Sequence, residues 1–253
     1  MDIKKGVVCA GGHAKRLGEL TRMQNKHLLG VFQWPMIYYP LKLLENAGIT
    51  DIMIVTGQEH AGQMIEQLGN GQVVDRDGRE ILSLNLTYRV QMRPGGIAQA
   101  ISLAKDFCRD CSFAAILGDN IFEQGIDFGV IPENEAHIFI CEVKDPERFG
   151  VPIFQSNEII EIIEKPKTTP SSNFAVTGLY VYGVNSGIFD VIAGLKPSGR
   201  GELEITDVNN HYIKERKLFH SIVQGWWRDV GTYDSLTEVG ALIKKTGACG
   251  IRF

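Results

Sequence analysis

Short apolar runs alternate with stretches of helical periodicity through the first half of the chain. Runs rich in β-branched residues predict four buried strands, at residues 6–10, 51–56, 84–91 and 113–117. Apolar positions at helical spacing predict three helices between them, at residues 36–47, 60–68 and 96–107. This alternation predicts an open, mostly parallel sheet with helices on both faces.

The second half of the chain is richer in strand signals. Apolar runs predict strands, some of them antiparallel, at residues 138–143, 151–154, 159–164, 175–184 and 219–224. Two helices are expected, at residues 186–194 and 205–215, with Glu204 or Thr206 as the cap of the second. No repeat or linker separates the halves. Residues 1–253 are therefore expected to form one domain, divided at about residue 125 into two subregions.

Composition and charge narrow the class of protein. The chain has 253 residues and a net charge of -4, which does not favour a basic nucleic-acid-binding protein. No apolar run reaches the roughly 20 residues that span a bilayer, and no signal peptide is recognisable, so we expect a cytoplasmic protein without a membrane partner. Five cysteines are an odd number in a chain without a secretion signal, so structural disulfides are not expected. Cys108-x-x-Cys111 lacks the second ligand pair that a zinc site needs.

Paired glycines follow the first predicted strand, and two cations come after them. Gly11-Gly12 directly follows the apolar residues 7–10, and Arg16 and Lys26 stand further along the chain. Glycine lets backbone N–H groups approach an anion closely, and the cations neutralise it, so we expect a phosphate site. The alternative is a tight strand-to-helix turn with a surface arginine. The spacing fits neither an ATPase P-loop nor a dinucleotide fingerprint.

Other polar residues stand where predicted strands end. Gln91 ends the third strand, and Asp119 follows the fourth, so we expect both at the sheet edge where ligands bind in open α/β folds. Asp229 lies in the segment GWWRDVGT. Two such carboxylates suit Mg²⁺, which takes its other ligands from phosphates and water. The alternatives are a turn residue for Asp119 and a loop carboxylate paired with Arg228 for Asp229.

A carboxylate and a cation stand side by side at the end of the strand predicted at residues 159–164. Glu164 and Lys165 precede Pro166, which stops the strand. Together they can bind a hydroxyl and a phosphate of one ligand. The alternative is an ordinary charged hairpin end.

Taken in order, eleven motifs of this chain resemble those of the sugar-nucleotide pyrophosphorylases, and among them the glucose-1-phosphate thymidylyltransferases. They are AGG…RL (10–17), T…NKHLL (21–29), PMIYYPL (35–41), AGI-x-DI (47–52), GGIAQA (95–100), LGDNIF (117–122), DPERFGV (145–151), EKPK (164–167), AVTGLYVY (175–182), GELEITDVN (201–209) and WWRDVGTYDSL (226–236). Each motif is weak alone, but together they cover nearly the whole chain.

The resemblance implies a fold and a reaction. The fold is a Rossmann-like three-layer α/β/α arrangement with a mostly parallel mixed central sheet. A strand-rich sugar-binding half (about 126–253) follows the nucleotide-binding half (about 1–125). In the reaction, dTTP transfers a nucleotidyl group to glucose 1-phosphate or a close hexose 1-phosphate, giving a dTDP-sugar and pyrophosphate with Mg²⁺ as cofactor.

The resemblance also implies roles for individual residues. The catalytic set is Arg16, Lys26, Asp119, Lys165 and Asp229, of which Asp119 and Asp229 hold the metal. Nucleotide binding involves Ala10, Gly11, Gly12, Arg16, Lys26, Gln91, Gly96 and Asp119. Sugar phosphate meets Asn120, Gly150, Glu164, Lys165 and the segment around Val176-Thr177. An amide at Gln91 offers a donor and an acceptor together, which suits the imide edge of thymine or uracil.

The sequence departs from the family pattern beside the paired glycines. His13-Ala14-Lys15 replaces the small residues usual there, and Trp34 and Met92 stand near the expected nucleotide site. Longer relatives carry a C-terminal regulatory segment, so a short form with a reduced or absent regulatory site is expected. The alternatives are a UTP-dependent or modified-sugar enzyme and a non-catalytic nucleotide-sugar-binding subunit. A homo-oligomer is compatible with each of these functional alternatives.

Overall fold

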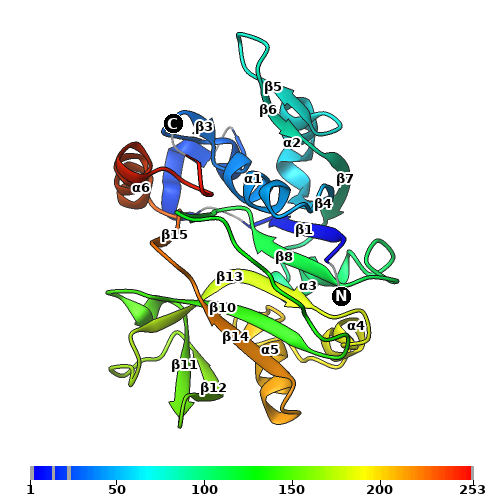
Figure 1. Cartoon of the computed structure of the whole chain (residues 1–253), viewed down its shortest axis with the longest axis vertical. Helices are drawn as coiled ribbons and strands as arrows, with labels where there is room; N and C mark the ends of the chain where they lie inside the picture. The colour runs from blue at the N-terminus through cyan, green and yellow to red at the C-terminus, as the bar shows by residue number, and fades with distance from the viewer. Residues whose placement is uncertain (1–2, 13–14, 22–23, 252–253) are drawn as a thin grey trace.

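The centre of the molecule is a mixed sheet. A computed structural model describes residues 3–12, 15–21 and 24–251, and in this part of the chain seven strands pair in the order β14-β10-β13-β8-β1-β4-β7 (Figure 1). Their bounds are β1 Lys5–Ala10, β4 Asp51–Gly57, β7 Asn85–Gln91, β8 Phe113–Leu117, β10 Ala136–Glu142, β13 Phe174–Tyr182 and β14 Leu218–Ile222. Only β13 runs antiparallel to both of its neighbours, so the predicted mostly parallel sheet is confirmed.

Helices cover both faces of this sheet because its inner strands are buried on both sides. In β1, Val8 and Ala10 pack into one apolar cluster, whereas Val7 and Cys9 pack into the other. The first cluster takes residues from α1 (Tyr38–Asn46), α2 (Ala61–Leu68) and α6 (Tyr233–Thr246). The second takes residues from α3 (Ile97–Ser102), α4 (Ile188–Ala193) and α5 (Ile205–Lys214). The expected three-layer arrangement is therefore confirmed.

Smaller elements complete the architecture. Two-stranded units pair β2 (Gly30–Val31) with β3 (Trp34–Pro35), β5 (Gln72–Val74) with β6 (Glu80–Ser83), β11 (Gly150–Gln155) with β12 (Glu158–Glu164), and β9 (Asn120–Phe122) with β15 (Trp227–Asp229). The 3-10 segments are η1 (Lys15–Thr21), which is kinked at Gly18, and the single turns η2 (Lys26–Leu28), η3 (Gln58–His60) and η4 (Pro146–Arg148). The β11–β12 hairpin projects from the lower part of the molecule, and β5–β6 projects from the top (Figure 1). None of the described helices is long and apolar enough to cross a membrane.

Two local expectations were wrong. The helix expected at 96–107 ends at Ser102, where the hydroxyl donates to the Gln99 carbonyl at 2.7 Å and so competes with the helical backbone bond. Neither expected cap acts on α5. Glu204 stands at the cap position, but its carboxylate accepts from Ser198 at 2.6 Å instead, and Thr206 donates to Glu164 at 2.7 Å.

The sheet joins the two subregions expected from the sequence. Strands β1, β4, β7 and β8 come from residues before about 125, and β10, β13 and β14 come from residues after it. The shared sheet supports a single domain, which stays a prediction.

Candidate active site

Adjoining pockets line the edge of the sheet where the strands from the first half of the chain end. The first pocket takes in Gly11, Gly12, Lys26 and Gln91. The second takes in Asp119, Glu164, Lys165 and Asp229. A connecting pocket contains Gly11, Lys26 and Gln91 from the first and Asp119 from the second. The strand ends thus bring Lys26, Gln91, Asp119 and the second-pocket residues along one continuous cleft, whereas Ala10 does not line it.

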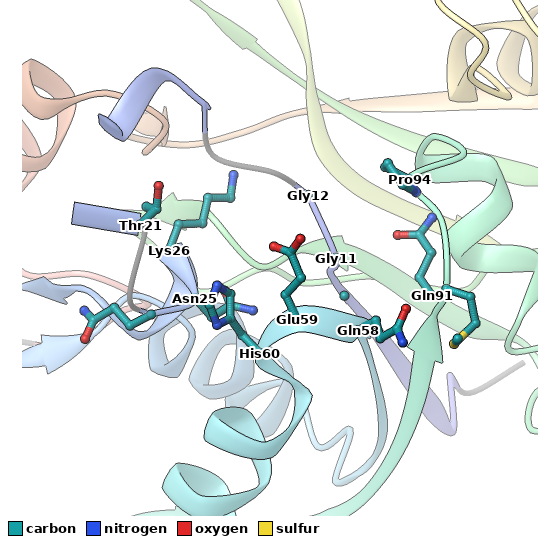
Figure 2. Close-up of a pocket in the computed structure, with 13 residues that line it drawn as sticks. Gly11, Gly12, Thr21, Asn25, Lys26, Gln58, Glu59, His60, Gln91 and Pro94 are labelled. Atoms are coloured by element: carbon teal, nitrogen blue, oxygen red, sulfur yellow. The ribbon is translucent and has the colours of Figure 1, made fainter. Parts of the chain in front are cut away.

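The paired glycines line the first pocket beside Lys26 and Gln91 (Figure 2). A Cβ atom on Gly11 would overlap Oε1 of Gln91, and one on Gly57 would lie 3.2 Å from the Gly11 carbonyl oxygen. Two neighbouring strands therefore approach each other here more closely than side chains allow. Gly12 has open space at its Cβ position. Ala10 is fully buried at the end of β1, behind this surface.

Gln91 ends β7 and is almost fully buried, with 6% of its surface exposed. Its Nε2 donates to the Gly96 carbonyl at 3.3 Å and to the Gln99 side chain. Gly96 has φ 92°, and a Cβ there would overlap the Leu203 carbonyl oxygen. Only glycine fits this position, which turns the chain from β7 into α3.

Lys26 and Asp119 form an ion pair where the pockets meet. Only 13% of the Lys26 side chain and 12% of the Asp119 side chain are exposed. Burial raises the pKa of Asp119, but the charge of Lys26 and hydrogen bonds from Lys26 and Asn120 outweigh it and hold that pKa below its usual range. The carboxylate is therefore charged at neutral pH and able to bind a cation.

A buried histidine fixes the turn that carries Lys26. Burial, together with the charge of Lys26, lowers the pKa of His27 to about 3, so its ring is neutral. Its Nδ1 lies 2.6 Å from Oδ1 of Asn25, which can only accept, so Nδ1 carries the hydrogen. The same Oδ1 accepts from the His27 backbone at 3.0 Å. These bonds hold η2 so that Lys26 enters the cleft.

Asp119 and Asp229 come together through the short β9–β15 ladder. Asn120 pairs with Asp229 in this ladder, and the Val230 amide donates to the Asp119 carbonyl at 2.9 Å. Both carboxylates line the second pocket. The described residues contain no cluster of three or more histidine, cysteine or carboxylate groups suited to a metal. Two carboxylates beside the expected phosphate site nevertheless suit Mg²⁺, which usually keeps waters and binds substrate phosphates.

Asn120 is mainly engaged with protein groups. Its Oδ1 accepts from the Gly178 amide at 2.9 Å and from Nε1 of Trp227 at 2.7 Å. Its Nδ2 donates to Asp119 at 3.0 Å. One amide hydrogen is left for a ligand. The side chain thus ties β13 and β15 to the turn between β8 and β9 that contains Asp119.

The second pocket also contains the predicted sugar-phosphate residues. Glu164 pairs with Gly150 across the β11–β12 hairpin, and its Oε2 accepts from Thr206 at 2.7 Å. The Lys165 ammonium lies 3.1 Å from the other oxygen of Glu164. Val176 lines the pocket as expected.

Thr177 corrects the expectation for the segment around Val176. Side chains alternate along β13, so Val176 packs into one apolar cluster and Leu179 into the other, on the opposite face of the sheet. Thr177 shares the face of Leu179, is fully buried and does not face the cleft.

The sequence profile of the nucleotidyl transferase family matches residues 5–246. This chain belongs to that family. It is 38% identical over 248 residues to glucose-1-phosphate thymidylyltransferase of Neisseria meningitidis, and 40% identical over 252 residues to that of Xanthomonas campestris. These matches cover 95% and 96% of this chain and 82% of each relative. The predicted family and its enzymatic nature are confirmed.

Solved structures agree with the assignment of this chain to the nucleotidyl transferase family. A Bacillus anthracis protein provisionally assigned as a glucose-1-phosphate thymidylyltransferase, in complex with sucrose, is 46% identical, with a TM-score of 0.85. The match covers 99% of this chain and 97% of that one. A UDP-glucose pyrophosphorylase complexed with UDP-glucose is 22% identical with a TM-score of 0.80, over 96% of this chain and 99% of that one. At this identity it supports the fold alone.

The structure of this nucleotidyl transferase adds a cation that the sequence argument missed. Arg200 lines both the second and the connecting pocket, and its guanidinium donates to Glu204 at 2.8 and 3.2 Å. Glu204 raises the pKa of Arg200. The sequence signal that could have indicated this residue is an arginine between two glycines shortly before α5. Its reach to the cleft depends on a loop that folds against α3.

Some predicted residues of the nucleotidyl transferase lie outside the described part. His13 and Ala14 fall there. Arg16 is described only by its backbone, within η1. The phosphate-binding role of Arg16 therefore stays a prediction.

Proposed function

We propose that this enzyme transfers a thymidylyl group from dTTP to glucose 1-phosphate, or to a close hexose 1-phosphate, releasing pyrophosphate. The observation that carries the proposal is the continuous cleft from the Gln91 amide, past Lys26 and Asp119, to Glu164 and Lys165. The relatives named glucose-1-phosphate thymidylyltransferase support the choice of substrates.

The nucleoside triphosphate occupies the first pocket in this proposal. Gln91 and the backbone of Gly96 bind the base. Gly11 and Gly12 let backbone N–H groups approach the phosphates, while Lys26 and Arg16 neutralise their charge. Arg16 steadies the pyrophosphate as it leaves.

The sugar 1-phosphate occupies the second pocket. Lys165 binds its phosphate, joined by Arg200 at the junction of the pockets. Glu164, held by Thr206, accepts from a sugar hydroxyl. Gly150 lines the same pocket beside Glu164, and without a side chain it leaves space there for the sugar.

Asp119 and Asp229 hold Mg²⁺ in this proposal. When bound, the ion offsets negative charge on the reacting phosphates. Lys26 gives up part of its contact with Asp119 to the incoming phosphates. The attacking sugar phosphate oxygen is already anionic, so no general base is needed. The residues contribute mainly by positioning two anions in line and offsetting their charge.

A substrate panel tests this function. Pyrophosphate release is measured with dTTP, UTP and CTP, each paired with several hexose 1-phosphates. We expect turnover with dTTP and glucose 1-phosphate, and a loss of roughly 100-fold or more for Asp119→Asn, because a key charge is removed. Asp77→Asn, an exposed residue of the β5–β6 turn, serves as the control and keeps full activity.

UTP is the second candidate nucleotide. The Gln91 oxygen accepts equally well from the imide N–H of uracil and of thymine. UTP turnover at least as fast as dTTP turnover would replace the thymidine assignment. Nucleotide binding without any pyrophosphate release would instead favour a non-catalytic subunit.

A further inference from the structure

We infer that Gln99 determines which nucleotide base this enzyme accepts, by holding the Gln91 amide in one of its two orientations. Gln99 is a positioning residue, since it acts through Gln91 and is not among the residues lining the described pockets. The inference rests on the proposed nucleotide site and deepens it.

The orientation of the Gln91 amide follows from an unambiguous acceptor. The Gly96 carbonyl oxygen can only accept, and it lies 3.3 Å from one terminal atom of Gln91, which must therefore be Nε2. The second hydrogen on Nε2 points to the Gln99 side chain, which must present its oxygen. Both donors of the Gln91 amide are thus used inside the protein.

The Gln91 oxygen is left for the ligand. It lies above Gly11, where a Cβ would overlap it, and Figure 2 shows it turned into the first pocket. The amide therefore offers an acceptor alone, whereas the sequence suggested a donor and an acceptor together. A base that binds here must therefore donate a hydrogen bond to the Gln91 oxygen, as the imide N–H of thymine or uracil can. Cytosine presents a bare ring nitrogen there, which would face the oxygen without a hydrogen.

The two acceptors that lock Gln91 sit on a rigid frame. The Leu203 amide donates to the Gly95 carbonyl at 2.8 Å, and the Ala98 amide donates to the Leu203 carbonyl at 3.3 Å, fixing the start of α3. A Cβ on Gly95 would lie 3.0 Å from Cγ of Gln99, so the missing side chain lets Gln99 pack across this loop. Its oxygen is therefore held toward Gln91.

Removing the Gln99 oxygen weakens the preference of the Gln91 amide for its present orientation. A flipped Gln91 amide would set its oxygen against two acceptors in this protein, which is costly in a buried site. With Gln99 gone, only the 3.3 Å bond to Gly96 opposes the flip. A flipped amide presents N–H groups to the base and so favours cytosine.

Three substitutions at one position test the inference. Gln99→Glu keeps an acceptor, Gln99→Leu removes it, and Gln99→Lys replaces it with a donor that favours the flipped amide. The readout is the kcat/KM for dTTP divided by that for CTP, with the same sugar 1-phosphate. We expect this ratio to stay within about threefold of wild type for Gln99→Glu, and to fall by about 10-fold or more for Gln99→Leu and further for Gln99→Lys.

The KM for sugar phosphate and a matched glutamine control complete the test. The KM for sugar phosphate should not change in any of the three variants. Gln67→Leu on α2, which removes an amide that donates a hydrogen bond to the Tyr38 hydroxyl, should leave the nucleotide ratio unchanged. A merely structural role predicts equal losses for both triphosphates. An unchanged dTTP to CTP ratio in Gln99→Leu would therefore overturn the inference.

A binding measurement separates this inference from the proposed reaction. Calorimetric titration with dTDP and CDP requires no turnover, so it reports base selection even if the sugar substrate has been misassigned. A tenfold or larger drop in the dTDP to CDP affinity ratio in Gln99→Leu supports the lock. Equal ratios in wild type and Gln99→Leu contradict it.

Discussion

Gly11 illustrates how one residue links the sheet to the ligand. It occupies the point where the Gln91 oxygen and the Gly57 backbone converge, and no side chain fits between them. The sequence marked Gly11, Gln91 and Asp119 because each stands where an apolar run stops, and strand ends are visible in the pattern.

Substitution of Gly11 should damage nucleotide binding more than folding. In Gly11→Ala the new methyl group pushes against the Gln91 amide, so we expect the KM for dTTP to rise about 10-fold or more, while the KM for glucose 1-phosphate changes little. Steady-state kinetics with each substrate varied in turn measure this split. Gly30→Ala, at an exposed glycine with open space, is the control, and equal KM values for dTTP in both variants would contradict the argument.

The orientation of single side chains could not be predicted from the sequence. The direction of the Gln91 amide depends on a carbonyl at Gly96 and an oxygen at Gln99, and neither contact has a sequence signal. Arg200 reaches the cleft only because Leu203 pairs with the loop before α3. Such contacts arise from tertiary packing, which periodicity does not encode.

Among the elements, strands were more predictable than the ends of helices. Each predicted strand is found within two residues at either end, since burial on both faces leaves continuous apolar runs. The helix predicted at residues 96–107 was too long at its C-terminal end, because Ser102 ends α3 through a hydrogen bond to the Gln99 carbonyl. The short β9–β15 ladder, which joins Asp119 and Asp229, links segments about 100 residues apart and has no local signal.

Helix α2 offers a stabilising substitution. Gly62 stands inside this helix, and a Cβ there meets nothing within 4 Å. Gly62→Ala should therefore raise the free energy of unfolding by about 0.5–1 kcal/mol, since alanine loses less backbone entropy. Urea denaturation measures this change. Gly96→Ala, whose Cβ would overlap the Leu203 carbonyl, should be destabilised in the same assay, and a loss of stability in Gly62→Ala would refute the prediction.

Acid should lower the stability of the protein through a buried histidine beside edge strand β14. Nε2 of His137 on β10 lies 2.9 Å from Oγ of Ser221 on β14. Burial, together with the charge of His220, lowers the pKa of His137 from 6.5 to about 4. The unfolded chain binds a proton at His137 between these pH values, whereas the folded chain does not, so stability falls as pH drops through this window.

Replacement of this histidine should flatten the acid response. In His137→Gln we expect a smaller drop in Tm between pH 6.5 and about 4 than in wild type, because the proton uptake of the unfolded chain at this position is gone. Thermal unfolding followed by circular dichroism at several pH values gives the slope. His211→Gln, at an exposed position of α5, controls for the loss of a histidine. Parallel slopes for His137→Gln and wild type would rule the explanation out.

At the scale of the whole molecule, the cleft needs both subregions. The first half of the chain supplies Gly11, Lys26, Gln91 and Asp119, and the second supplies Lys165 and Asp229. The shared sheet holds these groups in one frame, as in-line transfer between two anions requires. The order of motifs along the chain was enough to predict that both halves contribute residues to the cleft. It could not predict the β9–β15 ladder or the loop contacts around Leu203 that hold those residues in place.

The most direct test of the central claim is a time course of both products. Wild-type enzyme is incubated with dTTP, glucose 1-phosphate and Mg²⁺, and pyrophosphate and dTDP-glucose are quantified together by anion-exchange chromatography. We predict that the two products form in equal amounts and that Asp119→Asn slows both by roughly 100-fold or more. The account would be contradicted if dTTP were consumed without formation of a nucleotide sugar, or if wild-type enzyme released no pyrophosphate.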